Sequence, residues 1–438
     1  MVSPLALLLV TFFVMMVAGV PLSFAMLAST IVYFLFVGQP LYLVVQQFFI
    51  GIDSFTLLAI PFFMLAGDLM VVSGTAERML KFSNAIVGRF RGGVGYVTIV
   101  SSMLFGGCSG SAISEIAGLG RMQVRMMESG GFARPFATAL AVAASIKGAI
   151  IPPSIPMVLV GAITGTSIGG LLVGGAVPGV LVAVAMAIVV ILTSRGMRPA
   201  RNEKLSPRAF ATIFLESVPF LAMPFIILGG ILTGLFTPTE ASAAAVAYGL
   251  LLLAVSKGST LDWKNLVLLF VRSGTLAAVV LLLSGASAVF SWVLAAEKVP
   301  ELVANLLFGI TDNKYVILLI INIFLLLWSM VMDMLPAIFI IVPMLMPLAV
   351  KLGIDPVHFG VVVVFNLVIG LITPPYGAAL FTGSIVTGVP LEKIVRSMWP
   401  FMLAAIAVLM IITYIPQTVL LLPRLFVIGP HGRVQFDC

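Results

Sequence analysis

Long apolar stretches recur along the whole chain and alternate with short polar segments. Runs of spanning length lie, for example, at residues 177–194, 265–283 and 398–414. A helix needs about 20 mostly apolar residues to cross a bilayer. Because such runs recur from end to end, the first one is interpreted as structural and not as a cleaved signal peptide. The pattern predicts an all-α polytopic membrane protein.

Composition and charge agree with this pattern. Of the 438 residues, 61% are hydrophobic and only 9% are charged, too few charges to cover a soluble globule. The net charge of +7 lies in the loops, where it orients membrane segments, so we expect a lipid bilayer and no nucleic acid as partner. The tail 426–438 changes character and is left out of the predicted fold.

Positive charge gathers in the loop 195–208, which predicts a cytoplasmic location. Basic clusters at 78–91 and 121–134 also count as cytoplasmic, although only one apolar stretch, 93–120, separates them. Because both ends of this stretch are expected on the cytoplasmic side of the membrane, we predict a re-entrant hairpin with a non-helical tip at GGCSGSAIS, 106–114. The alternative is one ordinary span with one basic cluster outside. The charged residues of the loop are Arg195, Arg198, Arg201, Glu203, Lys204 and Arg208.

Two proline pairs interrupt apolar segments, in GAIIPPS (148–154) and in GLITPPYG (370–377). A shift of 222 residues aligns the two motifs and further positions around them. Ahead of the second pair, WSMVMDMLP (328–336) stands where a second hairpin tip would lie. Its flanks carry only Lys314 against Asp312 and Lys351 against Asp355, and this lack of positive charge predicts that the second hairpin enters from the opposite face. The sequence therefore predicts inverted repeats, each with a re-entrant helical hairpin and a broken helix, as in secondary transporters.

The breaks are candidate cation sites, because proline leaves nearby carbonyl groups without helical partners. Inside a membrane such backbone is tolerated where it faces a polar cavity or an ion. The alternative is a simple kink. We expect a first sodium site, Na1, from the hydroxyl groups of two tip serines and three carbonyl groups. Its residues are Ser109, Ser111, Gly148, Ile150 and Pro152.

A second sodium site, Na2, is expected at the second break. Asp333 would there face Thr373 and the backbone of Gly377. A carboxylate at the centre of a membrane protein costs about 2.5–3.5 kcal/mol on insertion scales, which favours a functional role. The alternative is that Asp333 caps the second arm of the hairpin.

Candidate substrate residues lie beside the breaks. Half-helices that begin near Ser111 and Ser154 direct positive dipole ends to the midplane and favour a carboxylate. Ser154, Tyr376 and Lys147 are the candidate substrate-binding residues. For Lys147, the favoured alternative is a side chain that snorkels along the scaffold. We expect Glu115 to be a structural polar contact and His358 to lie at the surface.

Several segments together resemble a known family. They are FGGCSGSAISEIAGLG, the run from IIPPSIPMVLVGAITGTS to GGAVPG, GGILTGLFTPTEASA and GLITPPYGAALFTGSIVTGVP. The chain is similar over residues 1–425 to the large membrane (M) subunit of tripartite ATP-independent periplasmic (TRAP) transporters. Lys147 departs from the apolar or small residue that the resemblance leads us to expect.

The resemblance implies an elevator-type secondary transporter in the bacterial inner membrane. A small four-helix Q subunit, here expected as a separate chain, and a periplasmic substrate-binding P subunit would be partners. Sodium ions would drive uptake of an organic acid, of the sialic acid or C4-dicarboxylate type, and we lean towards N-acetylneuraminate. The scaffold would comprise residues 1–75 and 209–295. Residues 76–194 and 296–425, each with an amphipathic arm, would form the moving unit.

Other functional classes find less support. No HExxH or aspartate-rich motif of an intramembrane enzyme occurs, the chain has only two histidines, and no GxxxxGK[ST] loop of a primary pump is present. The chain is therefore predicted not to be an enzyme. The alternative function is a stand-alone divalent-anion/sodium symporter that works without a binding protein.

Overall fold

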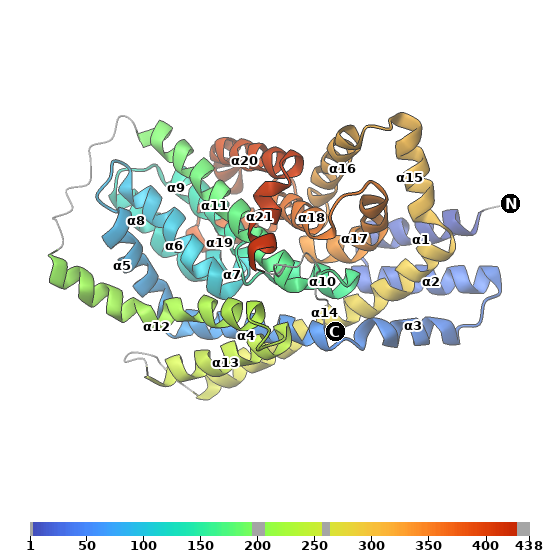
Figure 1. The fold of residues 1–438 in the computed structure, drawn as a ribbon, viewed down its shortest axis with the longest axis horizontal. Helices are drawn as coiled ribbons and strands as arrows, with labels where there is room; N and C mark the ends of the chain where they lie inside the picture. Colours follow the sequence, from blue (N-terminus) through green and yellow to red (C-terminus); the bar gives the residue numbers. More distant parts are fainter. Residues whose placement is uncertain (1–2, 195–205, 256–262, 427–438) are drawn as a thin grey trace.

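The computed structural model describes residues 3–194, 206–255 and 263–426, and these ranges contain helices and no strand (Figure 1). Seven of the described helices are long and apolar enough to cross a membrane. The number is eight if the helices α15 (Val299–Ile310) and α16 (Lys314–Ser329), which meet at a bend of 120°, are counted as one span. The prediction of an all-helical polytopic membrane protein is confirmed. Arg195, Arg198, Arg201, Glu203 and Lys204 of the predicted cytoplasmic loop, and residues 427–438 of the tail, lie outside the described ranges.

One group of helices comes from the first part of the chain and from its middle. The long helix α14 crosses this group and packs against α2, α3 and α4, while α13 lies along α4 (Figure 1). Helices α1 and α2 pack on each other. The bounds are α1 Pro4–Val17, α2 Leu22–Val37, α3 Tyr42–Ile52, η1 Phe55–Leu58, α4 Ala59–Val72, α12 Pro207–Leu232, α13 Pro238–Val255 and α14 Trp263–Ala296.

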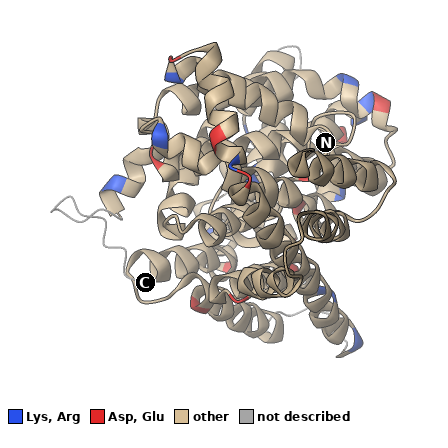
Figure 2. Ribbon diagram, turned by 90° about the vertical axis from the view of Figure 1, so that its right-hand side faces the viewer, with Lys and Arg blue, Asp and Glu red and all other residues tan. Residues whose placement is uncertain are grey.

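The outer helices present apolar side chains away from the core. Phe225 on α12 is 75% exposed, and Trp263 on α14 is 74% exposed. Lys, Arg, Asp and Glu are sparse along the ribbon (Figure 2). Apolar side chains exposed on helices of spanning length suit a lipid environment. The protein is a multi-pass membrane protein.

The first hairpin and broken helix follow the amphipathic helix α5. The chain doubles back after α6, so that the side-chain amide Nε2 of Gln123 in α8 donates to Ser101 Oγ (3.1 Å) and Ser102 Oγ (3.2 Å) in α6. The bounds are α5 Thr75–Val87, α6 Gly93–Ser109, α7 Ala112–Glu115, η2 Ile116–Gly120, α8 Arg121–Ser129, α9 Arg134–Ser145, η3 Ile146–Ala149, α10 Ile155–Thr164 and α11 Ile168–Thr193.

The last third of the chain repeats this order of elements. A helix pair with an interrupted tip is followed by a helix broken at a proline pair and by a long helix. Both proline pairs contain a cis peptide bond, between Pro152 and Pro153 and between Pro374 and Pro375. The opposite orientation of the two units stays a prediction. The bounds are α15 Val299–Ile310, α16 Lys314–Ser329, α17 Met334–Lys351, α18 Pro356–Gly370, α19 Ala378–Thr387, α20 Leu391–Tyr414 and α21 Gln417–Phe426.

The non-helical tip of the first hairpin is shorter than the predicted 106–114. Helix α6 continues through Ser109, and α7 begins at Ala112. Gly110 adopts a left-handed conformation (φ 61°), and its N–H group donates to the carbonyl of Gly106. This is a glycine helix terminus, which needs one residue with positive φ and not a long irregular segment.

The expectation that His358 lies at the surface is wrong. Its side chain is 3% exposed in α18, and Nε2 lies 2.8 Å from the carbonyl oxygen of Ile412 in α20. Helix α18 is covered by α11, α16, α17 and α20. A polar side chain near its start therefore needs a partner inside the protein.

Candidate functional site

The first hairpin tip touches the first break through backbone atoms. A Cβ atom on Gly106 would lie 2.6 Å from Cα of Gly148, and one on Gly110 would lie 2.8 Å from the carbonyl oxygen of Pro153. A Cβ atom on Gly107 would lie 3.4 Å from the carbonyl oxygen of Pro152. Glycines at the tip therefore let two stretches of polar backbone approach each other in the interior.

The structure brings four of the five predicted Na1 residues together. Ser109 is buried, and its hydroxyl lies 3.5 Å from the carbonyl oxygen of Ser111, across the tip from Gly148 and Pro152. The carbonyl oxygen of Ile150 points elsewhere, because it lies against Gly175 in α11. The N–H groups of Ile150 and Ile151 both donate to Lys147 O (3.0 and 2.7 Å), which makes the break a tight turn.

Ser154 closes the first break from inside the protein. Its fully buried hydroxyl donates to Ala149 O (2.5 Å) and accepts a hydrogen bond from the N–H group of Met157 (3.4 Å) at the start of α10. The side chain thus satisfies one carbonyl of the break and caps the following helix. Both contacts are internal to the broken helix.

Two opposite charges lie beside the first break. Oε2 of Glu115 would be 3.0 Å from a Cβ atom on Gly148, and Lys147 is the residue before Gly148. Both side chains are 0% exposed, so the prediction that Lys147 snorkels along the scaffold is wrong. Snorkelling requires a path to water, and the hairpin tip covers this position. Sequence reasoning left Glu115 out of the site, although it and Lys147 are opposite charges in apolar segments.

The second hairpin tip also contacts its break. A Cβ atom on Gly370 would collide with Ser329, at the end of α16. The N–H group of Tyr376 donates to Met330 O (3.3 Å) in the tip. The Tyr376 side chain is 47% exposed, which leaves this break more open than the first.

The predicted Na2 residues lie on these two touching segments. Asp333 is half-buried at the N-cap position of α17, and its side chain makes no capping hydrogen bond. The hydroxyl of Thr373 donates to Ile369 O (2.8 Å), and the backbone of Gly377 starts α19. Among the described residues, no hydrogen bond or ion pair joins Asp333 to Thr373 or Gly377. The structure thus brings the two segments together, with Asp333 at the start of α17.

The stem of the second hairpin contains a buried amide cluster. Nδ2 of Asn366 in α18 donates to Oδ1 of Asn322 in α16 (2.9 Å), and Nδ2 of Asn322 donates to Oγ1 of Thr413 in α20 (3.0 Å). All three side chains are buried. Neutral hydrogen bonds therefore join the hairpin, the broken helix and the long helix that follows.

A cavity of ≈ 250 Å³ lies where the outer helices meet α10 and α17. Four serine residues contribute to its wall, among them Ser291, whose buried Oγ has no hydrogen-bond partner among the described residues. Hydroxyl groups on an otherwise apolar wall suit a small polar molecule that is only partly desolvated. The serines are Ser54, Ser284, Ser287 and Ser291.

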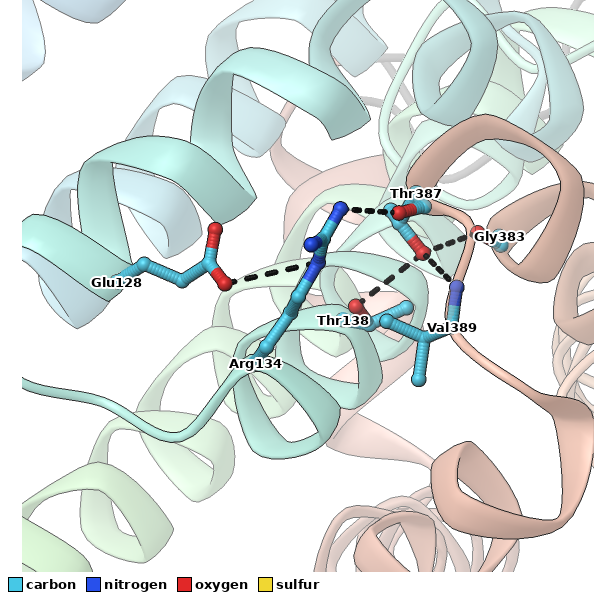
Figure 3. Close-up of polar contacts among 6 residues, drawn as sticks. All are labelled: Glu128, Arg134, Thr138, Gly383, Thr387 and Val389. Carbon is cyan, nitrogen blue, oxygen red and sulfur yellow. Dashed lines mark hydrogen bonds and ion pairs between the residues drawn. The ribbon is translucent and has the colours of Figure 1, made fainter.

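The two units are joined near the end of α19 (Figure 3). The guanidinium group of Arg134 in α9 donates to Thr387 O (2.6 Å) and pairs with Glu128 in α8 (3.5 Å). Nε of Arg121 donates to Val386 O (3.2 Å). Arginine side chains thus bond the last carbonyl groups of a helix, a placement that the helix dipole favours.

Comparisons with known proteins identify the family of the chain. Residues 9–418 match the family model described as "Tripartite ATP-independent periplasmic transporter, DctM component". The chain is 37% identical to the sialic acid TRAP transporter large permease protein SiaM of Vibrio cholerae, covering 93% of this chain and 96% of SiaM.

Two further relatives are named for other substrates. The C4-dicarboxylate TRAP transporter large permease protein DctM of Pseudomonas aeruginosa is 35% identical over 85% of this chain and 87% of its own. The isethionate TRAP transporter permease protein DctMQ of Oleidesulfovibrio alaskensis is 36% identical over 95% of this chain and 66% of its own. The chain belongs to the DctM family of TRAP transporter large permeases, which are transporter components and not enzymes.

Proposed function

We propose that the protein is the sodium-coupled permease of a TRAP system that takes up an organic acid across the bacterial inner membrane. The observation that carries the proposal is the contact between each hairpin tip and its broken helix, at Gly106–Gly148 and at Gly370–Ser329. Each contact brings hydroxyl groups and non-helical backbone to one place in the interior. Such places bind ions and substrates in secondary transporters.

The residues at the breaks suit an alkali cation. Hard cations prefer oxygen ligands, and the first break offers the hydroxyl groups of Ser109 and Ser111 with the backbone at Gly148 and Pro152. At the second break Asp333 adds a carboxylate. The bound ion would there compensate the charge of Asp333 and fill the coordination that the break leaves open.

The substrate class is an organic acid. The relatives are named for sialic acid, C4-dicarboxylate and isethionate, which are all anions at neutral pH. The cavity that contains Ser284, Ser287 and Ser291 supports a small polar cargo held between the outer helices and the broken helices. N-acetylneuraminate is the first acid to test.

The partners are a small Q subunit and a periplasmic P subunit, since the family forms tripartite systems. The relative named DctMQ is longer than this chain and shows by its name that the two permease parts can be fused. For the present chain we expect Q as a separate four-helix protein. The P subunit would deliver the acid at the periplasmic face.

Transport is proposed to follow an elevator mechanism, in which residues 76–194 and 296–425 move past the outer helices. Ser287 in α14 donates to Phe339 O in α17 (2.6 Å), which marks one contact between the two parts. Cysteine pairs between Ser287 and residues 338–342, in a variant without Cys108 and Cys438, should crosslink in one state. A second set, shifted along the membrane normal, should form in the other state. One set alone, with transport unaffected by locking it, would contradict an elevator.

The decisive experiment is uptake into proteoliposomes that contain the protein and its Q subunit. Labelled N-acetylneuraminate, a C4-dicarboxylate and isethionate are tested with the cognate P subunit, with inward sodium or potassium gradients. We expect uptake of one acid that needs both sodium and P. Uptake without P would favour the stand-alone symporter. Replacing Ser109 and Ser111 by alanine should depress sodium-driven uptake, and an unchanged sodium response would remove them from Na1.

A further inference from the structure

The pair Glu115 and Lys147 is the feature that the proposed sites leave unexplained. Each side chain is 0% exposed. Among the described residues, the carboxylate oxygens of Glu115 and Nζ of Lys147 have no hydrogen-bond partner within 3.5 Å, although the hydroxyl of Ser102 also interacts with Glu115. An isolated buried charge is very costly, and a pair without further hydrogen bonds recovers only part of that cost. Such a pair needs another explanation than stability.

The position of the pair connects it to the first break. Oε2 of Glu115 lies over Gly148, 3.0 Å from where a Cβ atom would be, and the Cα atom of Gly106 bounds the same space at 3.4 Å. Ser111, which caps α7, lies one turn before Glu115. A side chain larger than hydrogen at residue 148 would fill the place that the carboxylate faces. The carboxylate is therefore directed at the backbone predicted to hold a cation.

The ammonium group of Lys147 has the opposite electrostatic effect on a cation at Gly148. Lys147 directly precedes Gly148, and among the described residues no ion pair of 4.0 Å or less joins Lys147 to Glu115. Two unit charges about 4 Å apart interact with about 4 kcal/mol at an effective dielectric constant of 20, so a buried ammonium strongly affects a cation that binds beside it. The carboxylate attracts a cation at Gly148, and the ammonium repels it.

We propose that Glu115 is an acceptor for the cation at the first break and that Lys147 is a tethered counter-ion that competes with this cation. The pair sets the sodium affinity of the site, and because Lys147 already neutralises Glu115, sodium binds more weakly than it would to the carboxylate alone. This inference rests on the sodium coupling proposed above. The inference adds the Glu115 carboxylate to the serine hydroxyl groups and backbone carbonyl groups predicted for Na1.

The test is the thermal unfolding of the purified full chain with its Q subunit, titrated with sodium chloride against choline chloride at constant ionic strength. Lys147→Met keeps the length of the side chain and removes its charge. Sodium should raise the unfolding midpoint of this variant more than that of the wild type, with about tenfold lower half-saturation. Glu115→Gln should raise half-saturation at least tenfold, because it removes the acceptor and leaves the ammonium. The double variant Glu115→Gln/Lys147→Met should lie within threefold of the wild type.

A purely structural pair gives a different result. Both single variants would then lose stability equally, and sodium would shift them as it shifts the wild type; this outcome overturns the proposal. If Glu115→Gln does not fold, Glu115→Asp keeps the charge but withdraws it from Gly148 and should raise half-saturation about threefold; no change there also overturns it. Wild-type uptake without sodium dependence refutes the sodium coupling itself. Sodium-dependent uptake with unaltered titrations of the variants refutes only the role of the pair.

Discussion

The two breaks share one plan but differ in burial and charge. At the first, Lys147, Gly148 and Ser154 are fully buried, and a pair of opposite charges lies beside the backbone. At the second, Pro375 and Tyr376 are exposed, and a single carboxylate, Asp333, lies half-buried at the hairpin tip. The same backbone interruption is therefore buried beside Glu115 and Lys147 in the first unit, and more exposed beside one carboxylate in the second. We therefore expect the proposed Na2 site at the second break to exchange its ion more readily than Na1.

The largest expected effect concerns the backbone contact at the first break. Gly106→Ala should abolish most uptake and destabilise the protein by about 2–3 kcal/mol, because the new Cβ atom meets the backbone of Gly148 and a packed interior cannot yield. Gly229→Ala, where a Cβ atom meets nothing within 4 Å, is the matched control. Uptake and thermal unfolding in detergent measure both variants. A Gly106→Ala protein as active as the control would show that tip and break are not tightly packed.

The second expected effect separates the charges of the two breaks. Asp333→Asn should raise the sodium concentration for half-maximal uptake at least tenfold, since a carboxylate is a stronger cation ligand than a hydroxyl group. Ser109→Ala should raise it about threefold, in line with a neutral ligand worth about 0.5–1.5 kcal/mol. Sodium titration of uptake measures both. An equal effect of the two variants would contradict the distinction between the breaks.

The third expected effect concerns the neutral cluster in the stem of the second hairpin. Asn322→Ala removes a partner of Asn366 and of Thr413, and should lower stability by about 1–3 kcal/mol because buried polar groups lose their hydrogen bonds. Thr275→Ala, on an exposed part of α14, is the control and should change stability little. Thermal unfolding is the measurement. Equal midpoints would show that the cluster does not hold the stem together.

The smallest expected effect concerns the joint between the two units (Figure 3). Arg134→Gln should lower stability by about 1 kcal/mol, since it removes the contact with Thr387 O and the ion pair with Glu128, both partly exposed. Lys81→Ala removes only an exposed pair with Glu77 within α5 and should cost at most about 0.5 kcal/mol. If Lys81→Ala lost more stability than Arg134→Gln, the amphipathic helix α5 would contribute more to the stability of the unit than the joint does.

The class of the protein can be predicted from the amino-acid pattern. Apolar runs of spanning length leave no soluble fold, and a proline pair within such a run breaks a helix wherever it stands, because proline lacks the N–H group that the helix needs. The hairpin serines, Gly148 and Asp333 could be named in advance since each is polar or small in an apolar segment. The family followed from the same segments.

The contacts between side chains far apart in the chain could not be predicted in this way. Sequence distance does not reveal that Glu115 lies over Gly148, that the carbonyl group of Ile150 faces α11, or that His358 is covered by α20. The extent of the first tip also depended on Gly110, whose left-handed conformation ends α6 one turn later than the glycine-rich composition indicates. A polar residue in an apolar segment shows that a partner is needed, but the packing of segments far apart in the chain selects that partner.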